Sequence, residues 1–334
     1  MKKLTKQMVP SIYHPTTLIF VDDDPNVIQN YALSLTDHFS FKGFTSPHKA
    51  LEYINDSKLV GPIDYRSNFY VQDFNHFQHE IANPDRFNQH SILVADYAMP
   101  GMNGVELCEK ISSRYLSKIL LTGIADEKIA TDAFNAGIIH QFLTKQDPNI
   151  ISKIASVVEW MQKDFFLRLS DRVAETMQYF CPPFLDDARF AAFFEELIEE
   201  ASICEYYLCH RPNGFILIDN EGNMERLLIY TERDLSFIYN MAVSRKAPEK
   251  LIAQLRPGKP VDSIPFFWKH RFGIYDIASE PWEDCFYPAT KLAGEEPFYY
   301  ARIKNKDAHE SLMIEHLSFY DYLENLRKSG ELIG

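Results

Sequence analysis

Short apolar runs, each ending in a polar side chain, alternate with helical patterns over the first 150 residues. The clearest runs are TLIFV at 17–21, ILVA at 92–95 and KILL at 118–121, with further runs in 41–44 and 138–145. Asp24 and Pro25 suit the N-cap and first position of the helix that follows the first run. Parallel strands need helical crossovers, so this alternation predicts a doubly wound, five-stranded parallel α/β sheet.

Polar residues stand at the predicted carboxyl ends of four of these strands. They are Asp22 with Asp23, Asp96, Thr122 and Lys145. Each alone is typical of solvated surface, but a parallel sheet brings its strand ends to one rim, where α/β proteins bind ligands. Three carboxylates, a hydroxyl and an ammonium suit phosphoryl transfer to an Asp, with Mg²⁺ on carboxylate oxygens and Asp96 as the nucleophile.

Four motifs occur in the order found in receiver domains: LIFVDDDP, ILVADYAMPGMNGVEL, KILLTG and HQFLTK. Residues 17–147 therefore resemble the CheY-like, flavodoxin-like receiver domain of bacterial two-component response regulators. The resemblance implies that Asp96 is the phosphoacceptor, assisted by Thr122 and Lys145. It also implies that Phe142 is the switch aromatic. The Mg²⁺ ligands would be the side chains of Asp22, Asp23 and Asp96 and the carbonyl oxygen of Ala98.

The resemblance also implies how the protein is used. A histidine kinase or phosphotransfer protein would phosphorylate Asp96 in a phosphorelay, and the receiver would catalyse only its own phosphorylation and dephosphorylation. One departure from the family pattern is Gln146, which follows Lys145 where receivers usually carry Pro. Because of that substitution, the backbone conformation of this loop cannot be inferred from the family pattern.

A second departure is an insertion at about 59–90, which is rich in aromatic residues and His. His76 and His79 are spaced to share one side of a helix, but no third metal ligand accompanies them, so packing or surface roles are favoured over a metal site. With so many aromatic residues, we expect the insertion to form a contact surface.

A long helical pattern covers residues 148–180, and Pro182 and Pro183 end it. Ile151, Ile154, Val158, Met161 and Phe165 recur at alternating spacings of three and four. The first turns are needed to cover the sheet, while the excess length is typical of a signalling or homodimerising helix. We assign 148–182 as a helical linker between two domains and keep both uses open.

Residues 183–334 are predicted to form a mixed α+β output domain of unknown type. The turn at 220–223 between two apolar runs indicates a β-hairpin, and a final helix is expected at 318–326. The segment 180–334 has 17 Lys or Arg against 26 Asp or Glu, a net of −9. This charge disfavours nucleic acid, and we find no helix-turn-helix, cyclic-dinucleotide or P-loop motif.

The output function therefore stays open between three classes. A protein-interaction output with an unknown partner is favoured, a receiver-controlled enzyme or nucleotide-binding output is the alternative, and a DNA-binding regulator comes third. Residues 1–16 are expected to be a tail without the apolar core of a secretory signal, and no stretch has the length of apolar residues that a membrane span needs. Together with five scattered cysteines, this predicts a cytoplasmic protein without membrane insertion.

Overall fold

The computed structural model places the chain in two compact units. It describes residues 8–35, 39–56, 80–113, 115–123, 126–176, 182–209, 213–258, 260–266, 285–294, 296–304 and 314–329, with side chains of the long helix described to residue 170. One unit, the receiver unit, comprises 13–71, 83–178 and 317–334. The other, the second unit, comprises 1–12, 72–82 and 179–316.

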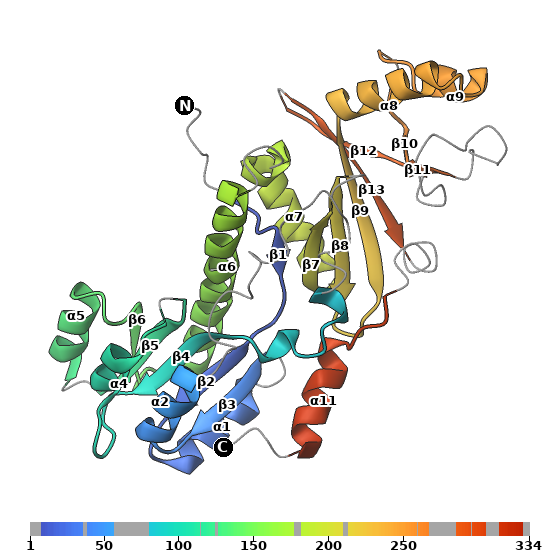
Figure 1. The fold of residues 1–334 in the computed structure, drawn as a ribbon. Coiled ribbons are helices and arrows are strands. Elements are labelled where there is room, and N and C mark those ends of the chain that lie inside the picture. Colours follow the sequence, from blue (N-terminus) through green and yellow to red (C-terminus); the bar gives the residue numbers. More distant parts are fainter. Residues whose placement is uncertain are drawn as a thin grey trace. The chain divides into compact units, whose positions relative to one another are not determined.

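The receiver unit contains a five-stranded parallel sheet of order β3-β2-β4-β5-β6, shown in Figure 1. The strands are β2 (Thr17–Val21), β3 (Ser40–Phe44), β4 (His90–Asp96), β5 (Ser117–Thr122) and β6 (Gln141–Thr144). The predicted fold class is confirmed. All residues of β2, β4 and β5 are buried, which explains why these strands read as continuous apolar runs and not as alternating ones.

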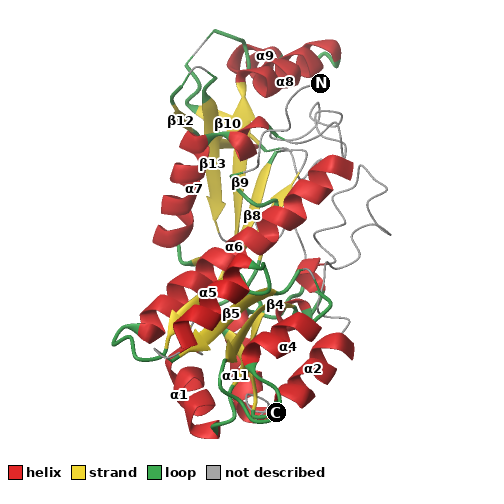
Figure 2. Ribbon diagram, turned by 90° about the vertical axis from the view of Figure 1, so that its left-hand side faces the viewer, coloured by secondary structure: helices red, strands yellow, loops and turns green. Residues whose placement is uncertain are grey.

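Helices cover both faces of this sheet (Figure 2). Apolar side chains of α1 (Pro25–Leu35) and α6 (Ile150–Thr176) pack on one face. Those of α2 (Pro47–Asp56), α4 (Gly104–Lys110) and α5 (Glu127–Asn135) pack on the other. Asp24 caps α1, since its Oδ1 accepts a hydrogen bond from Asn26 N at 2.8 Å, as the sequence indicates.

The long helix α6 matches most of the predicted helical segment. Ile154, Val158, Met161 and Phe165 are buried, whereas Ile151 is largely exposed. The first three of these buried residues pack with apolar side chains of the sheet and of α1. The predicted stripe therefore covers the sheet, which satisfies the simpler of its two expected uses.

The last helix of the chain, α11 (Phe319–Ser329), belongs to the receiver unit. Phe319 and Tyr322 contact the ring of Phe87, each with ring centroids 5.1 Å apart. Phe87 lies in the short helix η1 (Arg86–Asn88), at the end of the predicted insertion. This differs from the expected domain division, which assigns the helix to the second domain because it follows that domain in sequence.

The expected tail and insertion also differ in part from what is described. Ile12–Tyr13 form strand β1, and Tyr13–Thr16 belong to the receiver unit. Within the insertion, Phe87 and His90 are buried. The proposed pair His76 and His79 lies outside the described residues.

The second unit contains an antiparallel sheet of order β1-β7-β8-β9-β13-β12 and a two-stranded ribbon β10-β11. The strands are β7 (Ile203–Cys209), β8 (Gly214–Asp219), β9 (Met224–Thr231), β10 (Ser263–Pro265), β11 (Phe286–Pro288), β12 (Thr290–Leu292) and β13 (Phe298–Lys304). The predicted hairpin is confirmed, because β8 and β9 pair on either side of the turn at 220–223.

Helical segments accompany this sheet: η3 (Pro183–Asp186), α7 (Ala188–Glu200), α8 (Glu232–Ser244) and α9 (Glu249–Gln254). Phe190 and Phe194 of α7 pack against Phe215 of β8, which places an aromatic cluster between helix and sheet. Across the residues that the structure describes, no helix combines the length and apolar character of a membrane span.

Candidate functional site

The carboxyl end of β2 supplies two adjacent carboxylates of different exposure. Asp22 is buried and Asp23 is exposed. The backbone positions Asp22, since its N–H donates to Phe44 O at 3.2 Å, and its Oδ1 accepts from Asp24 N at 3.0 Å. The strand β2 lies at the point where the order of strands reverses, the position at which sheets of this topology bind ligands.

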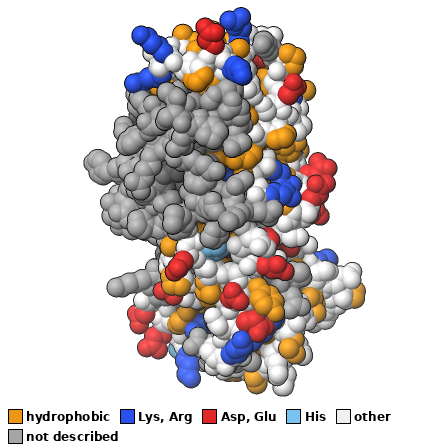
Figure 3. Space-filling view, turned by 90° about the vertical axis from the view of Figure 1, so that its right-hand side faces the viewer, with side chains coloured by type: hydrophobic (Ala, Val, Ile, Leu, Met, Phe, Trp, Pro, Cys, Tyr) orange, Lys and Arg blue, Asp and Glu red, His pale blue; other side chains and the backbone are white. Residues whose placement is uncertain are grey.

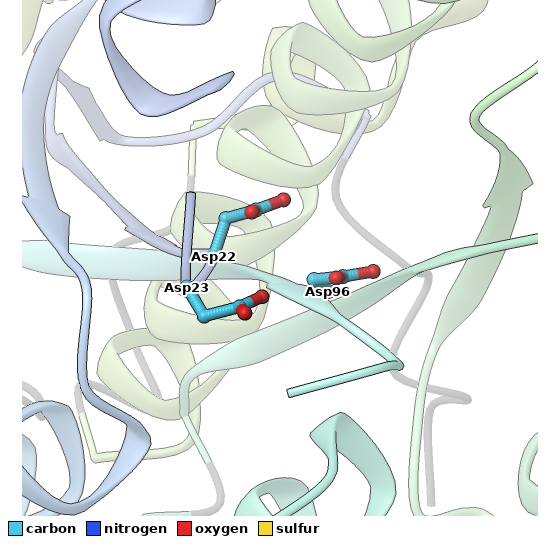
Figure 4. A group of neighbouring side chains, drawn as sticks. All are labelled: Asp22, Asp23 and Asp96. Atoms are coloured by element: carbon cyan, nitrogen blue, oxygen red, sulfur yellow. The ribbon is translucent and has the colours of Figure 1, made fainter. Parts of the chain in front are cut away.

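The carboxyl end of the neighbouring strand β4 supplies Asp96. Carboxylate oxygens of Asp22, Asp23 and Asp96 all lie within 4.8 Å of one another, and Figure 4 shows the three side chains gathered at the two strand ends. This is the convergence that the sequence predicts, and it arises because β2 and β4 are parallel neighbours.

The loop after Asp96 turns directly into α4. Gly104 N donates to Tyr97 O at 3.0 Å, and a Cβ atom at residue 104 would lie only 2.2 Å from the carbonyl oxygen of Asp96. Asn103 caps the helix, because its side chain accepts from the N–H of Glu106 while Glu106 accepts from Asn103 N. The sequence reasoning missed this cap, although Asn followed three residues later by Glu is a capping-box signal.

Lys145 joins the acidic residues from the end of β6. Its Nζ lies 2.8 Å from Asp22 Oδ2 and 2.9 Å from Asp96 Oδ1, so one ammonium bridges the buried carboxylates. The side chain of Lys145 is 28% exposed, which leaves it reachable from solvent. Despite Gln146 in place of Pro, the loop is a tight turn, in which Asp147 N donates to Thr144 O at 3.0 Å.

The remaining predicted residues lie on the adjoining strands β5 and β6 and in the loop after Asp96. Thr122 ends β5, its hydroxyl donates to Gly123 O at 3.0 Å, and its carbonyl accepts from Lys145 N at 2.9 Å. Ala98 is exposed in the loop after Asp96. Phe142 is partly buried on β6, and its ring meets that of Phe134 edge-on at 6.3 Å.

The local charges act on two nearby pKa values. Partial burial lowers the pKa of Lys145, but its hydrogen bonds to Asp22 and Asp96 and their charges outweigh burial, so the pKa lies above its ordinary value. Burial also raises the pKa of Tyr31 on α1, to which Lys145, Asp22 and Asp96 add smaller, opposing contributions. Lys145 is therefore held in its charged form, beside a phenol held neutral.

The arrangement can bind positive charge and present a nucleophile in one place. Among the described residues, three carboxylates gather here and the Lys145 ammonium contacts two of them, so negative charge is in excess at this rim. Asp96 is the carboxylate on the central strand, and it contacts the Lys145 ammonium, while the exposed carboxylate of Asp23 lies close by. These are the parts that transfer of an anionic group onto a carboxylate requires.

Comparison with known proteins includes a similarity over nearly the whole chain. The response regulator LqsR of Legionella pneumophila is 31% identical, with a TM-score of 0.76, and the match covers 96% of this chain and 97% of that one. The receiver domain of a Francisella response regulator is 16% identical, with a TM-score of 0.31 over 45% of this chain and 98% of that one. A receiver domain from Clostridium thermocellum is 17% identical, with a TM-score of 0.31 over 46% of this chain and 95% of that one.

No family model and no curated protein matches the sequence. The similarity to LqsR nevertheless spans both units, and the parallel sheet with its acidic strand ends is that of a receiver. The chain belongs to the response regulators, as a member with a receiver domain followed by a second unit.

Proposed function

We propose that the chain is a phosphorylation-dependent regulator whose receiver accepts a phosphoryl group on Asp96. The observation that carries the proposal is the Lys145 ammonium, which bridges Asp22 and Asp96 beside the exposed carboxylate of Asp23. A cation already seated at the acceptor oxygen is suited to pair with the added phosphoryl charge.

The donor set at this rim fits Mg²⁺. All side-chain donors are carboxylate oxygens, which a hard divalent cation prefers, and two of the three carboxylates share one ammonium. Asp22, Asp23, Asp96 and the carbonyl oxygen of Ala98 would hold the ion. When bound, Mg²⁺ would offset the negative charge that gathers on the transferred phosphoryl oxygens.

The chain's own residues then have distinct roles. A carboxylate oxygen of Asp96 attacks phosphorus, an O–P bond forms, and the P–N bond to a kinase histidine breaks with its electron pair passing to the imidazole nitrogen. Lys145 shifts its pairing toward the phosphoryl oxygens, and the Thr122 hydroxyl exchanges its bond to Gly123 O for one to such an oxygen. Phe142 would follow as the switch aromatic.

A direct test is phosphorylation by a small phosphodonor in the presence of Mg²⁺, followed by intact-mass spectrometry. Wild type is expected to gain one phosphoryl group and Asp96→Asn none. Asp24→Asn is the matched control, because Asp24 lies beside the site but serves as the helix cap. The assignment fails if Asp96→Asn takes up as much phosphate as wild type.

A histidine kinase or phosphotransfer protein is the proposed donor, and the second unit is the proposed output. The net charge of −9 over 180–334 supports an output that binds protein in preference to nucleic acid. A cytoplasmic location and a homodimer through α6 belong to the same proposal. Sedimentation of wild type and of Asp96→Asn after phosphodonor treatment tests the dimer. If the dimer depends on phosphorylation, the wild type should associate and Asp96→Asn should not.

The rival outputs make different predictions. A nucleotide-binding or enzymatic output predicts thermal stabilisation of the full chain by a nucleotide or metal that survives Asp96→Asn. A DNA-binding output predicts DNA affinity that falls steeply with salt. Affinity capture with phosphorylated wild type, and Asp96→Asn as the reference, would identify a protein partner that depends on phosphorylation.

A further inference from the structure

The helix α8 packs one side against its own unit and leaves the other side exposed. Ala242 is buried in a small apolar cluster with Leu251 and Leu255, and Leu235 and Ile238 pack on the neighbouring cluster of sheet residues. A capping box fixes the start of the helix, since Thr231 Oγ1 accepts from Asp234 N and Thr231 N donates to Asp234 Oδ2. The helix is therefore well anchored without using its outer side.

The outer side carries an apolar pair flanked by a cation. Arg233, Phe237 and Met241 are spaced by four residues, which puts them in one row along the helix. Phe237 is 65% exposed, and Met241 beside it is half-buried. A single exposed apolar residue is ordinary, but an exposed Phe beside a half-buried Met on an anchored helix forms an apolar patch on the described part of the chain.

The sign of the local charge is opposite to that of the chain. Residues 232–258 hold five Lys or Arg against three Asp or Glu, a net of +2, in a chain with a net charge of −13. All five cations are exposed: Arg233, Arg245, Lys246, Lys250 and Arg256. Figure 3 shows Lys and Arg side chains, with hydrophobic and some acidic ones between them, over the end of this unit where α8 and α9 lie in Figure 1.

Lys246 adds an observation of a different kind. Its φ is 56°, in the left-handed region at the end of α8, where Gly is the favoured residue. Two backbone bonds hold this turn, from Lys246 N to Val243 O at 3.1 Å and from Ala247 N to Ala242 O at 3.0 Å. A Lys kept in a strained backbone position is accounted for if its charge is used in binding.

We propose that α8, with the cations around it, is the docking surface for an acidic protein segment that contributes an apolar side chain. The apolar side chain would cover Phe237 and Met241, and carboxylates would pair with Arg233 and Lys246. Charge complementarity selects this partner, because the exposed Phe237 lies in a segment of net charge +2, with Arg233 one helical turn before it, in an otherwise acidic chain. The proposal rests on the proposed role of the second unit as a protein-binding output and names the chemistry of its partner.

An anionic membrane and a nucleic acid fit less well. Three acidic residues, Glu232, Asp234 and Glu249, are interspersed with the cations, and the remainder of the chain would be repelled by an anionic surface. One short amphipathic helix also gives only weak membrane binding without a second anchor.

The test uses two synthetic amphipathic peptides of about 15 residues, long enough to form helix on a surface. Their apolar face is Leu, and their polar face is Glu in one peptide and Lys in the other. Fluorescence anisotropy on the full-length, unphosphorylated protein is expected to show binding of the Leu/Glu peptide, weakened by salt, and none of the Leu/Lys peptide. Equal binding of these two peptides, or no binding of Leu/Glu, overturns the proposal.

Variants locate the binding. Phe237→Ala is expected to weaken Leu/Glu binding about tenfold, since a central aromatic anchor carries much of such an interface. Lys246→Gly is expected to weaken binding while raising the melting temperature, because Gly relieves the left-handed backbone strain; a purely structural role for Lys246 would not give these opposite signs. Tyr320→Ala, at the 56% exposed Tyr320 on α11, is the matched control and should bind as wild type.

Three further outcomes would overturn the proposal. The first is Leu/Glu binding that is unchanged in Phe237→Ala. The second is an absence of Leu/Glu binding together with binding to anionic phosphatidylglycerol vesicles or to duplex DNA that Phe237→Ala abolishes. The third is self-association of the protein that Phe237→Ala abolishes. Phosphorylation of Asp96 takes no part in these measurements. Their failure would therefore leave the phosphoacceptor assignment standing, and failure of that assignment would not alter the peptide binding.

Discussion

Gly104 and Asp96 approach each other more closely than any side chain at residue 104 would permit. A Cβ atom on Gly104 would lie 2.2 Å from Asp96 O and 2.7 Å from Leu120 Cδ1. Backbone on one side and a packed strand residue on the other leave little room for adjustment. At the scale of single residues, the position of Asp96, the proposed phosphoacceptor, thus depends on the absence of a methyl group next to it.

Gly104→Ala is expected to destabilise the protein by about 1–3 kcal/mol through overpacking and to slow phosphorylation by displacing Asp96. Urea unfolding and phosphodonor uptake would measure the two effects. Gly137→Ala is the comparison, because Gly137 has φ 70° but nothing near its Cβ position. This variant should lose stability through backbone strain alone, and its phosphorylation rate should be unchanged. Slowed phosphorylation of Gly137→Ala, or unchanged stability and phosphorylation of Gly104→Ala, would contradict this account.

Lys145→Met removes the ammonium shared by Asp22 and Asp96. Without Mg²⁺ the variant should be less stable by about 1–3 kcal/mol, since two buried carboxylates lose their partner. It should bind Mg²⁺ more tightly, because a competing cation is gone, and accept phosphate on the order of 10² more slowly. Calorimetric titration with Mg²⁺ and a phosphorylation time course would check both, with Lys145→Arg as the charge-preserving control.

The same bridge has a defined pH dependence. The pKa of Lys145 is raised in the folded protein, so its stabilising contribution is fully present below the ordinary value of 10.5 and is lost as the pH rises through the raised value. The stability difference between wild type and Lys145→Met should accordingly persist at neutral pH and close in strong alkali. A difference that grows with alkali would exclude the bridge as its cause.

At the scale of elements, α11 completes the receiver unit at the amino ends of its strands. Tyr322 OH donates to Asn88 Oδ1 at 2.6 Å and lies 3.3 Å from Ser40 Oγ. Ser40 in turn is bonded to Thr17 Oγ1 at 2.8 Å, which links the helix to β3 and β2. The last helix is therefore tied to the strands by a buried chain of hydroxyl groups as well as by ring contacts.

Tyr322→Phe is expected to lower the stability of the receiver unit by about 1–2 kcal/mol, because buried polar partners lose a hydrogen bond. Tyr320→Phe is the matched control, since Tyr320 lies on the same helix but is largely exposed. Hydrogen exchange of β2 and β3 peptides would localise the effect. If the amides of β2 and β3 are equally protected from exchange in both variants, α11 does not stabilise these strands through Tyr322.

At the scale of the whole molecule, the chain leaves the receiver unit after α6 and returns to it as α11. Residues 179–316 of the second unit are thus inserted between two elements of the receiver unit. Residues 1–12 and 72–82 also belong to the second unit, so the chain passes between the two units at five points, where an appended domain would have one. The helix α11 thus belongs to the receiver unit, although it follows most of the second unit in the sequence.

The receiver unit should also lose stability in mild acid. Burial lowers the pKa of His90 to about 4 and that of His14 to about 3, so the unfolded chain binds protons below pH 6.5 that the folded chain does not. Each histidine should cost about 2 kcal/mol at pH 5 relative to pH 7 or above. His90→Gln is expected to show a smaller loss between pH 7 and pH 5 in urea unfolding; an identical loss in both proteins would rule out His90 as a contributor.

Much of the receiver and its candidate site was predictable because it depends on local patterns. Continuous apolar runs identify buried parallel strands, and the carboxyl ends of parallel strands converge on one edge whatever the details of packing. Asp22, Asp23, Asp96 and Lys145 could therefore be grouped from sequence alone. The cap at Asn103 was also local, and its signal was present but unused.

Contacts between distant segments were decided only by the tertiary structure. The amphipathic pattern of Phe319, Tyr322 and Leu323 predicts a helix with one buried side, yet any apolar core could receive that side. The bridge by a single ammonium and the close approach of Gly104 likewise depend on through-space distances that no spacing encodes. The sequence by itself determined the parallel sheet and its acidic rim, because strands that alternate with helical crossovers must run in the same direction. Where the last helix packs and which side of α8 stays exposed were decided by which surfaces remained to be covered once the sheets had formed.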